Sequence, residues 1–160
     1  MTTHTATEMM PCDKHEHDST THLHKRILVV DDDPSVREML ARVLRVEGYQ
    51  AFSACDGAQA LDIVSKQRID LVLLDLNLPG QNGWEILSDL TARQPVLPVI
   101  IVTARANQVF TALSAGVGAL HEKPLNFHSL LQSISRILSE SVEERLDRIS
   151  GKRAHAALQG

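Results

Sequence analysis

Residues 70–80 read Asp70-Leu-Val-Leu-Leu-Asp75-Leu-Asn77-Leu-Pro79-Gly80. The residues from 71 to 74 are all apolar, and turn-forming residues close the stretch. A run this short and this apolar is typical of a parallel strand that is buried on both faces of its sheet. Asp75 ends the run, and a carboxylate there must reach water, a cation or a reaction partner, because burying it alone costs too much free energy. We therefore place Asp75 at the carboxyl edge of a sheet, where open α/β folds bind ligands.

Strands and helices are predicted to alternate on both sides of this run. Short apolar or β-branched runs predict further strands over residues 26–30, 50–54, 99–102 and 119–122. Apolar residues at helical spacing predict five helices, beginning near residues 34, 57, 84, 106 and 127. Met39 and Ala58 are predicted on the buried faces of the first two helices. Strict alternation implies right-handed crossovers, so the predicted fold class is α/β, a doubly wound parallel sheet covered on both faces.

The composition excludes several classes of protein. A net charge of −4 over 160 residues gives no electrostatic reason for direct nucleic acid binding. No apolar run approaches the roughly 18 residues of a membrane span, and the N-terminus lacks the features of a secretion signal. The two cysteines, Cys12 and Cys55, have no metal-binding or redox spacing, which suits a reducing compartment. We expect a cytoplasmic protein that does not contact membranes.

Reactive or charged groups stand at the ends of four predicted strands: Asp31 and Asp32, Asp75, Thr103, and Lys123. A parallel sheet brings these ends to one edge. At about 4 Å and an effective dielectric constant near 20, each pair of carboxylates repels by roughly 4 kcal/mol, which protonation or a divalent cation relieves. Oxygen ligands favour Mg²⁺. A cation, a hydroxyl and a lysine around one carboxylate suit phosphoryl transfer onto that carboxylate.

Residues 26–139 resemble the receiver domain of response regulators in two-component signalling. The resemblance rests on these words of the sequence: Ile27-Leu-Val-Val-Asp31-Asp32-Asp33-Pro34, the stretch 70–80 followed by Asn82-Gly83, Val99-Ile-Ile-Val-Thr103-Ala104, and Lys123-Pro124. Their order and spacing make the match specific. The resemblance implies a flavodoxin-like fold with a five-stranded parallel sheet of order 2-1-3-4-5 and five helices, an order that the family shares.

The resemblance also implies roles for the residues at the strand ends. Asp75 resembles the phosphoacceptor, Asp32 the direct Mg²⁺ ligand, and Asp31 the acid that holds a water of the metal. Asn77 is expected to offer its backbone carbonyl to the metal. Thr103 and Lys123 are expected to bind phosphoryl oxygens, and the peptide bond from Lys123 to Pro124 is expected to be cis.

A partner and an output follow from the same resemblance. A sensor histidine kinase or a histidine phosphotransfer protein is expected to donate the phosphoryl group to Asp75. The phosphorylated protein then binds a protein target through the face of helix four, strand five and helix five. Self-phosphorylation and slow self-dephosphorylation are the only reactions expected, so the chain is not predicted to be an enzyme in the usual sense.

Two residues are predicted to modify the switch. Leu120 stands where the family usually has Tyr or Phe, whose ring turns inward as the threonine hydroxyl moves toward the phosphoryl group. Leucine changes rotamer but offers no ring or hydroxyl, so either the usual switch is muted or Leu120 only packs. Arg105 lies two residues after Thr103, where its cation is predicted to cover the phosphoryl group and slow self-dephosphorylation; the alternative is a solvated loop arginine.

The chain is predicted to have three parts. Residues 1–24 are rich in Thr and His and are predicted to be a disordered tail, with metal chelation by its histidines as an alternative. Residues 25–140 form the predicted receiver domain. Residues 141–160 are predicted to be an amphipathic helical or flexible tail, in which the last helix continues and supports a homodimer, or frays. No output domain is visible, so the chain either acts through partners alone or is a piece of a longer protein.

Two other functions remain open at this point. Phosphohydrolases of the haloacid dehalogenase class also use an aspartate at a strand end with Mg²⁺, but they need a second aspartate two residues later, where this chain has Asn77. The other alternative is a receiver-like binding module that takes no phosphate, which the complete set of strand-end residues argues against.

Overall fold

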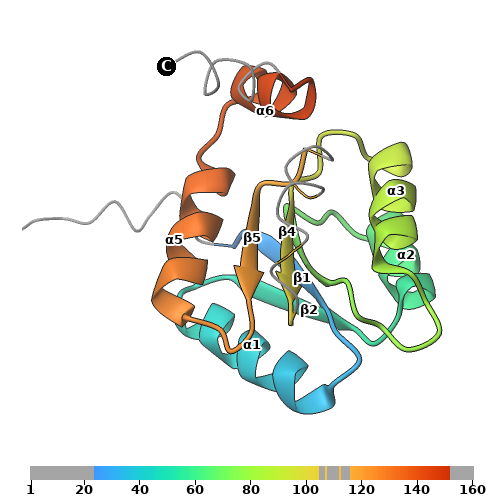
Figure 1. Ribbon diagram of the computed structural model, residues 1–160. Coiled ribbons are helices and arrows are strands. Elements are labelled where there is room, and N and C mark those ends of the chain that lie inside the picture. The colour runs from blue at the N-terminus through green and yellow to red at the C-terminus, as the bar shows by residue number, and fades with distance from the viewer. Residues whose placement is uncertain (1–23, 105–106, 108–111, 113–115, 152–160) are drawn as a thin grey trace, which may run out of the picture.

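A five-stranded parallel sheet with the order β2-β1-β3-β4-β5 forms the centre of the molecule. The structure is a computed structural model that describes residues 24–104, 107, 112 and 116–151. Its strands are β1 (Arg26–Val30), β2 (Gln50–Ala54), β3 (Leu71–Asp75), β4 (Val99–Thr103) and β5 (Ala119–Glu122). Both the parallel sheet and its strand order are as predicted, so the crossovers place all five carboxyl ends on one edge (Figure 1).

Helices cover both faces of this sheet. The described helices are α1 (Pro34–Val46), α2 (Gly57–Lys66), α3 (Gly83–Arg93), α5 (Phe127–Leu138) and α6 (Val142–Ile149). Alternate residues of each central strand point to opposite faces. Ile27, Val29, Leu71 and Leu73 therefore pack in one buried cluster with α1 and α5. Leu28, Val30, Val72 and Leu74 pack in a second cluster with α2 and α3.

Side-chain caps fix where the helices begin. Asp33 accepts a hydrogen bond from the backbone N–H of Ser35 at 2.8 Å, and Pro34 takes the first helical position, where no backbone donor is needed. Asp56, Asn82 and Asn126 cap α2, α3 and α5 in the same way. With these caps, α1 begins soon after the end of β1 and α5 begins soon after the end of β5. The two connecting loops at the carboxyl edge are therefore short.

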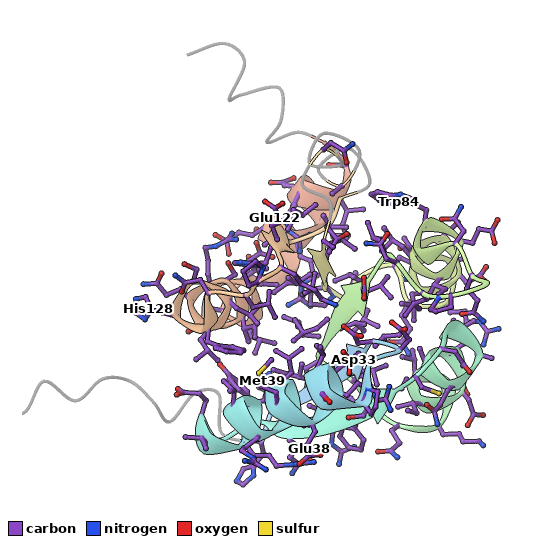
Figure 2. All side chains as sticks on the ribbon, turned by 60° about the horizontal axis from the view of Figure 1, so that its bottom comes forward. Asp33, Glu38, Met39, Trp84, Glu122 and His128 are labelled. Atoms are coloured by element: carbon purple, nitrogen blue, oxygen red, sulfur yellow. The ribbon has the colours of Figure 1, made fainter. Side chains whose placement is uncertain are left out.

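Two of the predicted core positions are wrong. Met39 lies on α1 (Figure 2) and is 43% exposed, whereas Ala41 of the same helix is buried. Ala58 is exposed and Ala60 takes the buried place on α2. Small alanine side chains give a weak amphipathic signal, so the predicted buried face followed the spacing of the larger residues. The residues that are buried lie two positions further along each helix.

Of the two predicted possibilities for the tail, the one in which the last helix continues past Leu138 is wrong, because α5 ends there. Ser141 starts a separate helix, α6, through a capping box in which its hydroxyl accepts from the Glu144 N–H at 3.1 Å and Glu144 accepts from the Ser141 N–H at 2.9 Å. Arg148 of α6 binds Glu140 at 2.9 Å and donates to the Gly116 carbonyl at 2.5 Å. The capping box thus marks the start of α6, and the contacts of Arg148 tie α6 to Glu140 and Gly116.

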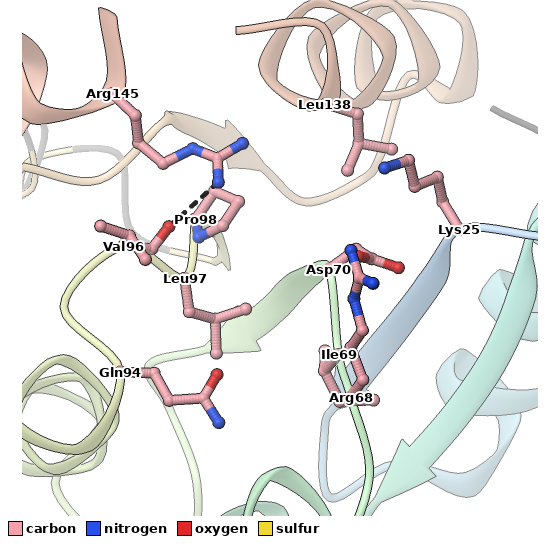
Figure 3. Close-up of a pocket in the computed structure, with 10 residues that line it drawn as sticks. All are labelled: Lys25, Arg68, Ile69, Asp70, Gln94, Val96, Leu97, Pro98, Leu138 and Arg145. Carbon is pink, nitrogen blue, oxygen red and sulfur yellow. Dashed lines mark hydrogen bonds and ion pairs between the residues drawn. The ribbon is translucent and has the colours of Figure 1, made fainter. Parts of the chain in front are cut away.

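Helix α6 lies at the amino edge of the sheet, away from the carboxyl ends of β4 and β5 (Figure 1). Arg145 donates to the Val96 carbonyl at 3.3 Å, beside a cavity of about 260 Å³ that opens between α6 and the starts of β1 and β3 (Figure 3). The predicted fourth helix, near 106–115, and the tail before His24 lie largely outside the described residues. None of the described helices has the length and hydrophobicity needed to cross a membrane.

Candidate functional site

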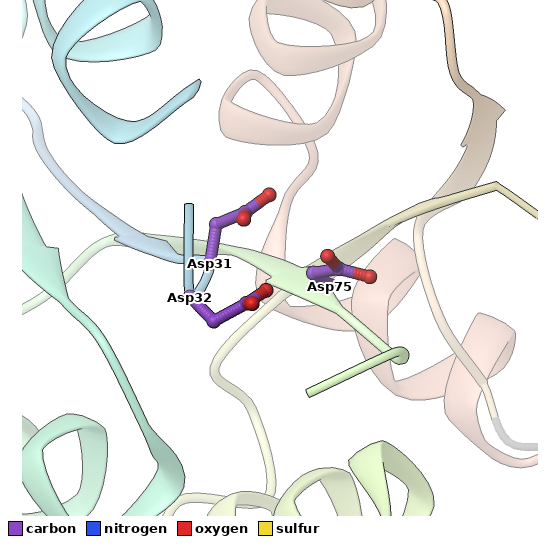
Figure 4. Close-up of side chains that lie close together, drawn as sticks. All are labelled: Asp31, Asp32 and Asp75. Carbon is purple, nitrogen blue, oxygen red and sulfur yellow. The ribbon is translucent and has the colours of Figure 1, made fainter. Parts of the chain in front are cut away.

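Three carboxylates meet at the carboxyl edge of the sheet. Asp31 follows β1, Asp32 comes next in the chain, and Asp75 ends the neighbouring strand β3. The register pairs Val30 of β1 with Leu74 of β3, so the residues that come next in each segment, Asp31 and Asp75, lie side by side. One oxygen from each carboxylate lies within 4.8 Å of the others (Figure 4). The structure thus brings together the three acids that the sequence placed at one edge.

Lys123 closes this cluster from the end of β5. Its Nζ donates to Asp31 Oδ2 at 2.8 Å and to Asp75 Oδ2 at 3.0 Å. Burial by itself lowers the pKa of Lys123, but the hydrogen bonds to the two carboxylates outweigh burial and raise its pKa above the ordinary value. Lys123 therefore carries a positive charge that bridges Asp31 and Asp75. The peptide bond that follows it, to Pro124, is cis, as predicted.

Asp75 is nearly buried, with 4% of its surface exposed. Burial raises its pKa above the ordinary value of 3.8, and the negative charge of Asp31 adds to this shift. The backbone N–H of Asn77, 2.9 Å from Asp75 Oδ1, and the ammonium of Lys123 act in the opposite direction but do not cancel the rise. The Asp75 carboxylate is thus held in place by two donors while its negative charge remains poorly solvated.

Thr103 ends β4 and is completely buried. Its hydroxyl oxygen accepts a hydrogen bond from the side-chain amide Nδ2 of Asn77 at 3.0 Å. The sequence did not predict this contact between the Asn77 side chain and Thr103. The hydrogen bond joins residues 26 positions apart, so no local pattern in the sequence predicts it.

Arg37 is a second residue that the sequence did not single out. Its Nη1 donates to the backbone carbonyls of Asp31 at 2.7 Å and Asp32 at 2.9 Å. The backbone N–H of Asp33 also donates to Asp31 Oδ1 at 2.9 Å. The two cluster acids that follow β1 are therefore fixed by α1 and by their own turn. Spacing along α1 does not distinguish Arg37 from the other arginines of that helix.

Of the two residues predicted to modify the switch, Leu120 is described by the structure and Arg105 is not. Leu120 is on β5, opposite Ile101 of β4, and packs partly buried against the cluster that includes α2 and α3. Arg105 lies outside the described residues, so its effect on dephosphorylation stays a prediction. Leu120 has the packing that an aliphatic side chain prefers, in keeping with either of its two predicted roles.

The residues present fit a divalent cation with oxygen ligands. The clustered acids supply three carboxylates, of which Asp32 is exposed and Asp31 and Asp75 are buried. Lys123 offers one positive charge to three negative ones, so the cluster keeps a net negative charge that attracts cations. Mg²⁺ prefers such carboxylate oxygens and keeps several waters, for which the exposed side of Asp32 leaves room.

The sequence matches a known protein family. A family model described as the response regulator receiver domain matches residues 27–135. Sporulation initiation phosphotransferase F of Bacillus subtilis (strain 168) is 40% identical over 118 residues, which make up 72% of this chain and 95% of that protein. The DNA-binding response regulator MtrA of Mycolicibacterium smegmatis is 40% identical over 130 residues, 80% of this chain. The match spans only 57% of the length of MtrA.

Solved structures agree with this match. A CheY-like receiver domain protein from Methanospirillum hungatei JF-1 is 31% identical with a TM-score of 0.69, over 78% of this chain and 98% of that one. The response regulator TrrA from Thermotoga maritima, crystallised in complex with Mg²⁺-BeF, is 33% identical with a TM-score of 0.66, over 71% and 98%. The chain belongs to the response regulator receiver domain family.

Proposed function

We propose that the chain is a phosphorylation switch in which Asp75 accepts a phosphoryl group from a histidine kinase or a histidine phosphotransfer protein. The observation that carries this proposal is the cluster itself. A nearly buried carboxylate, Asp75, lies within hydrogen-bond distance of the Lys123 ammonium and within 4.8 Å of two further acids. Such a carboxylate is poorly solvated, oriented by fixed donors, and placed at the ligand-binding edge of an α/β sheet.

The proposed reaction moves one phosphoryl group between two proteins. An oxygen of Asp75 attacks the phosphorus of a phosphohistidine, a phosphorus–oxygen bond forms, and the phosphorus–nitrogen bond breaks. The imidazole leaves with its electron pair and takes a proton from water. In such a transfer the protein mainly positions the groups and neutralises charge on the phosphoryl oxygens. Lys123 supplies a positive charge for that purpose, and Thr103 supplies a hydroxyl.

Mg²⁺ is the cofactor that we assign to the acidic cluster. Asp32 and Asp75 would hold it directly, Asp31 through a bound water, and Asn77 through its backbone carbonyl. The cation supplies charge neutralisation between the carboxylates and the incoming phosphoryl oxygens. Arg37 and the N–H of Asp33 keep the turn that carries Asp31 and Asp32 in place.

Phosphorylation of Asp75 is proposed to change partner binding at the face of helix four, β5 and α5. Thr103 ends β4, and the neighbouring strand β5 carries both Leu120 and, directly after it, Lys123. A change at Thr103 and Lys123 thus reaches this face through β5. Because Leu120 has no aromatic ring to turn, we expect smaller shifts around helix four than an aromatic residue would give.

The two alternative functions have less support. A haloacid dehalogenase-like phosphohydrolase needs a carboxylic acid two residues after Asp75, and Asn77 instead donates its amide to Thr103. A binding module without phosphorylation has no need for a lysine that spans two buried acids, because an unneeded buried charge is costly.

The test is phosphorylation by acetyl phosphate, followed by mass spectrometry of the intact protein. We expect the wild type to gain one phosphoryl group in the presence of Mg²⁺ and to gain none when the metal is chelated. Asp75→Asn keeps the size of the side chain but removes the attacking oxygen, so this variant should gain none under either condition. Catalytic release of phosphate from many substrates by the wild type would instead favour the phosphohydrolase.

A further inference from the structure

A cavity at the amino edge of the sheet lies apart from the proposed phosphorylation site. It has a volume of about 260 Å³ and opens between α6 and the starts of β1 and β3 (Figure 3). Its lining includes no acid of the cluster, and neither Thr103 nor Lys123. Sites that bury drug-sized ligands measure roughly 300–1,000 Å³, so this cavity has the size for a smaller molecule.

The charges that line this cavity are mostly positive. Lys25, Arg68 and Arg145 are cations, and Asp70 is the single acid among the lining residues. Three positive charges less one negative charge give the lining a formal charge of +2, whereas the whole chain carries −4. A cleft lined by one sign of charge concentrates ions of the opposite sign. The cavity therefore favours anions on a protein that is acidic overall.

The negative charge of Asp70 is already compensated by groups other than Lys25 and Arg145. Its Oδ2 accepts a hydrogen bond from the Arg26 backbone N–H at 2.8 Å, and its Oδ1 lies 3.3 Å from Arg68 Nε. The ammonium of Lys25, by contrast, forms no hydrogen bond or ion pair with any residue that the structure describes. Its positive charge at the cavity is therefore uncompensated within this part of the chain.

Arg145 approaches the cavity from α6 and also lacks an acidic partner among the described residues. Its Nη1 donates to the neutral Val96 carbonyl at 3.3 Å, and its Nε is buried with no hydrogen-bond partner there. Figure 3 shows the Arg145 and Lys25 side chains extending from opposite sides of the cavity. A cation that is partly removed from water and has no counter-charge is unfavourable, so an anion between these two side chains would be stabilised by both.

We propose that this cavity binds a small organic anion whose carboxylate or phosphate group lies between Lys25 and Arg145. The planar guanidinium of an arginine suits both of these head groups, and a lysine adds a point charge. An organic anion uses more of the cavity than an inorganic one does, because its body can pack against an apolar wall. That wall consists of Ile69, Val96, Leu97, Pro98 and Leu138.

The experiment is a titration of the full chain, followed by proton–nitrogen NMR spectra. Mg²⁺ is left out so that the acidic cluster does not attract the probes. Benzoate and phenyl phosphate carry the two head groups on the same apolar ring, and benzamide has the shape of benzoate without its charge. Added to about 10 mM, which nearly saturates a site with a dissociation constant of about 1 mM, both anions should shift the backbone amides of Ile69 and Leu97. Benzamide should shift neither amide.

Two variants each remove one positive charge from the cavity. We expect Lys25→Gln and Arg145→Gln to bind both anions about tenfold more weakly, the effect of losing one charge-assisted hydrogen bond. Arg145→Gln also removes the contact with the Val96 carbonyl, whereas Lys25→Gln removes a charge without breaking a side-chain contact in the described part of the chain. Lys66→Gln is the control, because Lys66 pairs with Asp62 on the surface of α2, and it should bind like the wild type.

Saturable binding of either anion at the cavity, weakened in both variants, supports the proposal, and the probe that binds more tightly identifies the head group. Three results would each overturn it. The first is that neither anion shifts the amides of Ile69 and Leu97. The second is that benzamide binds as tightly as benzoate. The third is that Lys25→Gln binds both anions as tightly as the wild type does.

Discussion

Lys123 joins two nearly buried carboxylates that come from different strands. Its Nζ lies 2.8 Å from Asp31 and 3.0 Å from Asp75, and its own side chain is 25% exposed. Buried acids without a partner are strongly unfavourable, so the Lys123 ammonium allows Asp31 and Asp75 to remain close together without a bound metal ion. In the proposed function, the same ammonium then faces the phosphoryl oxygens.

Replacing Lys123 by alanine should slow phosphorylation of Asp75 strongly. We expect labelling by acetyl phosphate to fall about 100-fold, the typical loss when one fixed donor to a developing negative charge is removed. Lys66→Ala is the matched control, because Lys66 forms an exposed pair with Asp62 on the surface of α2. Equal initial labelling rates for Lys123→Ala and the wild type would contradict the role given to Lys123.

The raised pKa of Asp75 predicts how stability depends on pH in the absence of metal. The folded protein keeps the Asp75 proton to a higher pH than the unfolded chain does, so between the ordinary pKa of 3.8 and the raised value the folded state binds more protons. The contribution of Asp75 to the free energy of unfolding therefore falls as pH rises through that window.

Urea denaturation at several pH values tests this pH dependence. The asparagine of Asp75→Asn cannot titrate, so the free energy of unfolding of this variant should not fall in the way that Asp75 causes in the wild type. The free energy of unfolding of the variant, minus that of the wild type, should therefore increase as pH rises through the window. A constant difference between the two proteins across the window would mean that burial does not raise the pKa of Asp75.

Among the secondary-structure elements, α6 lies outside the residues that resemble a receiver domain. Arg148 and Glu140 form an ion pair whose side chains are only 12% and 6% exposed, and Arg148 also binds the Gly116 carbonyl. Two loops that are distant in sequence are thereby joined at the amino edge of the sheet.

Breaking this ion pair should destabilise the protein. Arg148→Ala leaves Glu140 buried without its partner, and we expect the free energy of unfolding to fall by about 3 kcal/mol. Lys66→Ala breaks an exposed ion pair and should cost about 0.5 kcal/mol or less. Urea denaturation of both variants provides the comparison, and an Arg148→Ala loss as small as that of Lys66→Ala would show that α6 is not held by this pair.

The sequence predicts most of the elements because their signals are local. The observed bounds of β1, β2 and β5 equal the predicted ones, since each is a short run of residues closed by a turn. The break after Leu138 was missed although the capping-box residues Ser141 and Glu144 mark a new helix start in the sequence. The apolar spacing after Leu138, taken by itself, predicts a continuing helix.

At the scale of the whole molecule, the sheet topology explains why the site was predictable. Parallel strands bring their carboxyl ends together, so listing the polar residues at those ends already assembled Asp31, Asp32, Asp75, Thr103 and Lys123. The side-chain contacts of Asn77 and Arg37 were missed because they depend on rotamers and on packing between elements. Topology thus predicts which residues meet, and packing decides which atoms touch.

Mg²⁺ should stabilise the whole fold if the acidic cluster binds it. A ligand that binds only the folded state raises the free energy of unfolding, by about 2.7 kcal/mol when its concentration is 100 times the dissociation constant. We expect the melting temperature to rise with added MgCl₂ and to stay constant with NaCl of equal ionic strength. Asp32→Asn should reduce the rise, and an equal response of both proteins would place the cation elsewhere.

In the proposed function, Asp75 is the residue that carries the phosphoryl group. Reduction with borohydride converts an aspartyl phosphate to homoserine, which peptide mass spectrometry then locates in the chain. After treatment with acetyl phosphate and Mg²⁺, we expect homoserine at position 75 and aspartate at positions 31, 32 and 33. Homoserine at any of these other positions, or none at position 75 in protein that has gained a phosphoryl group, would contradict it.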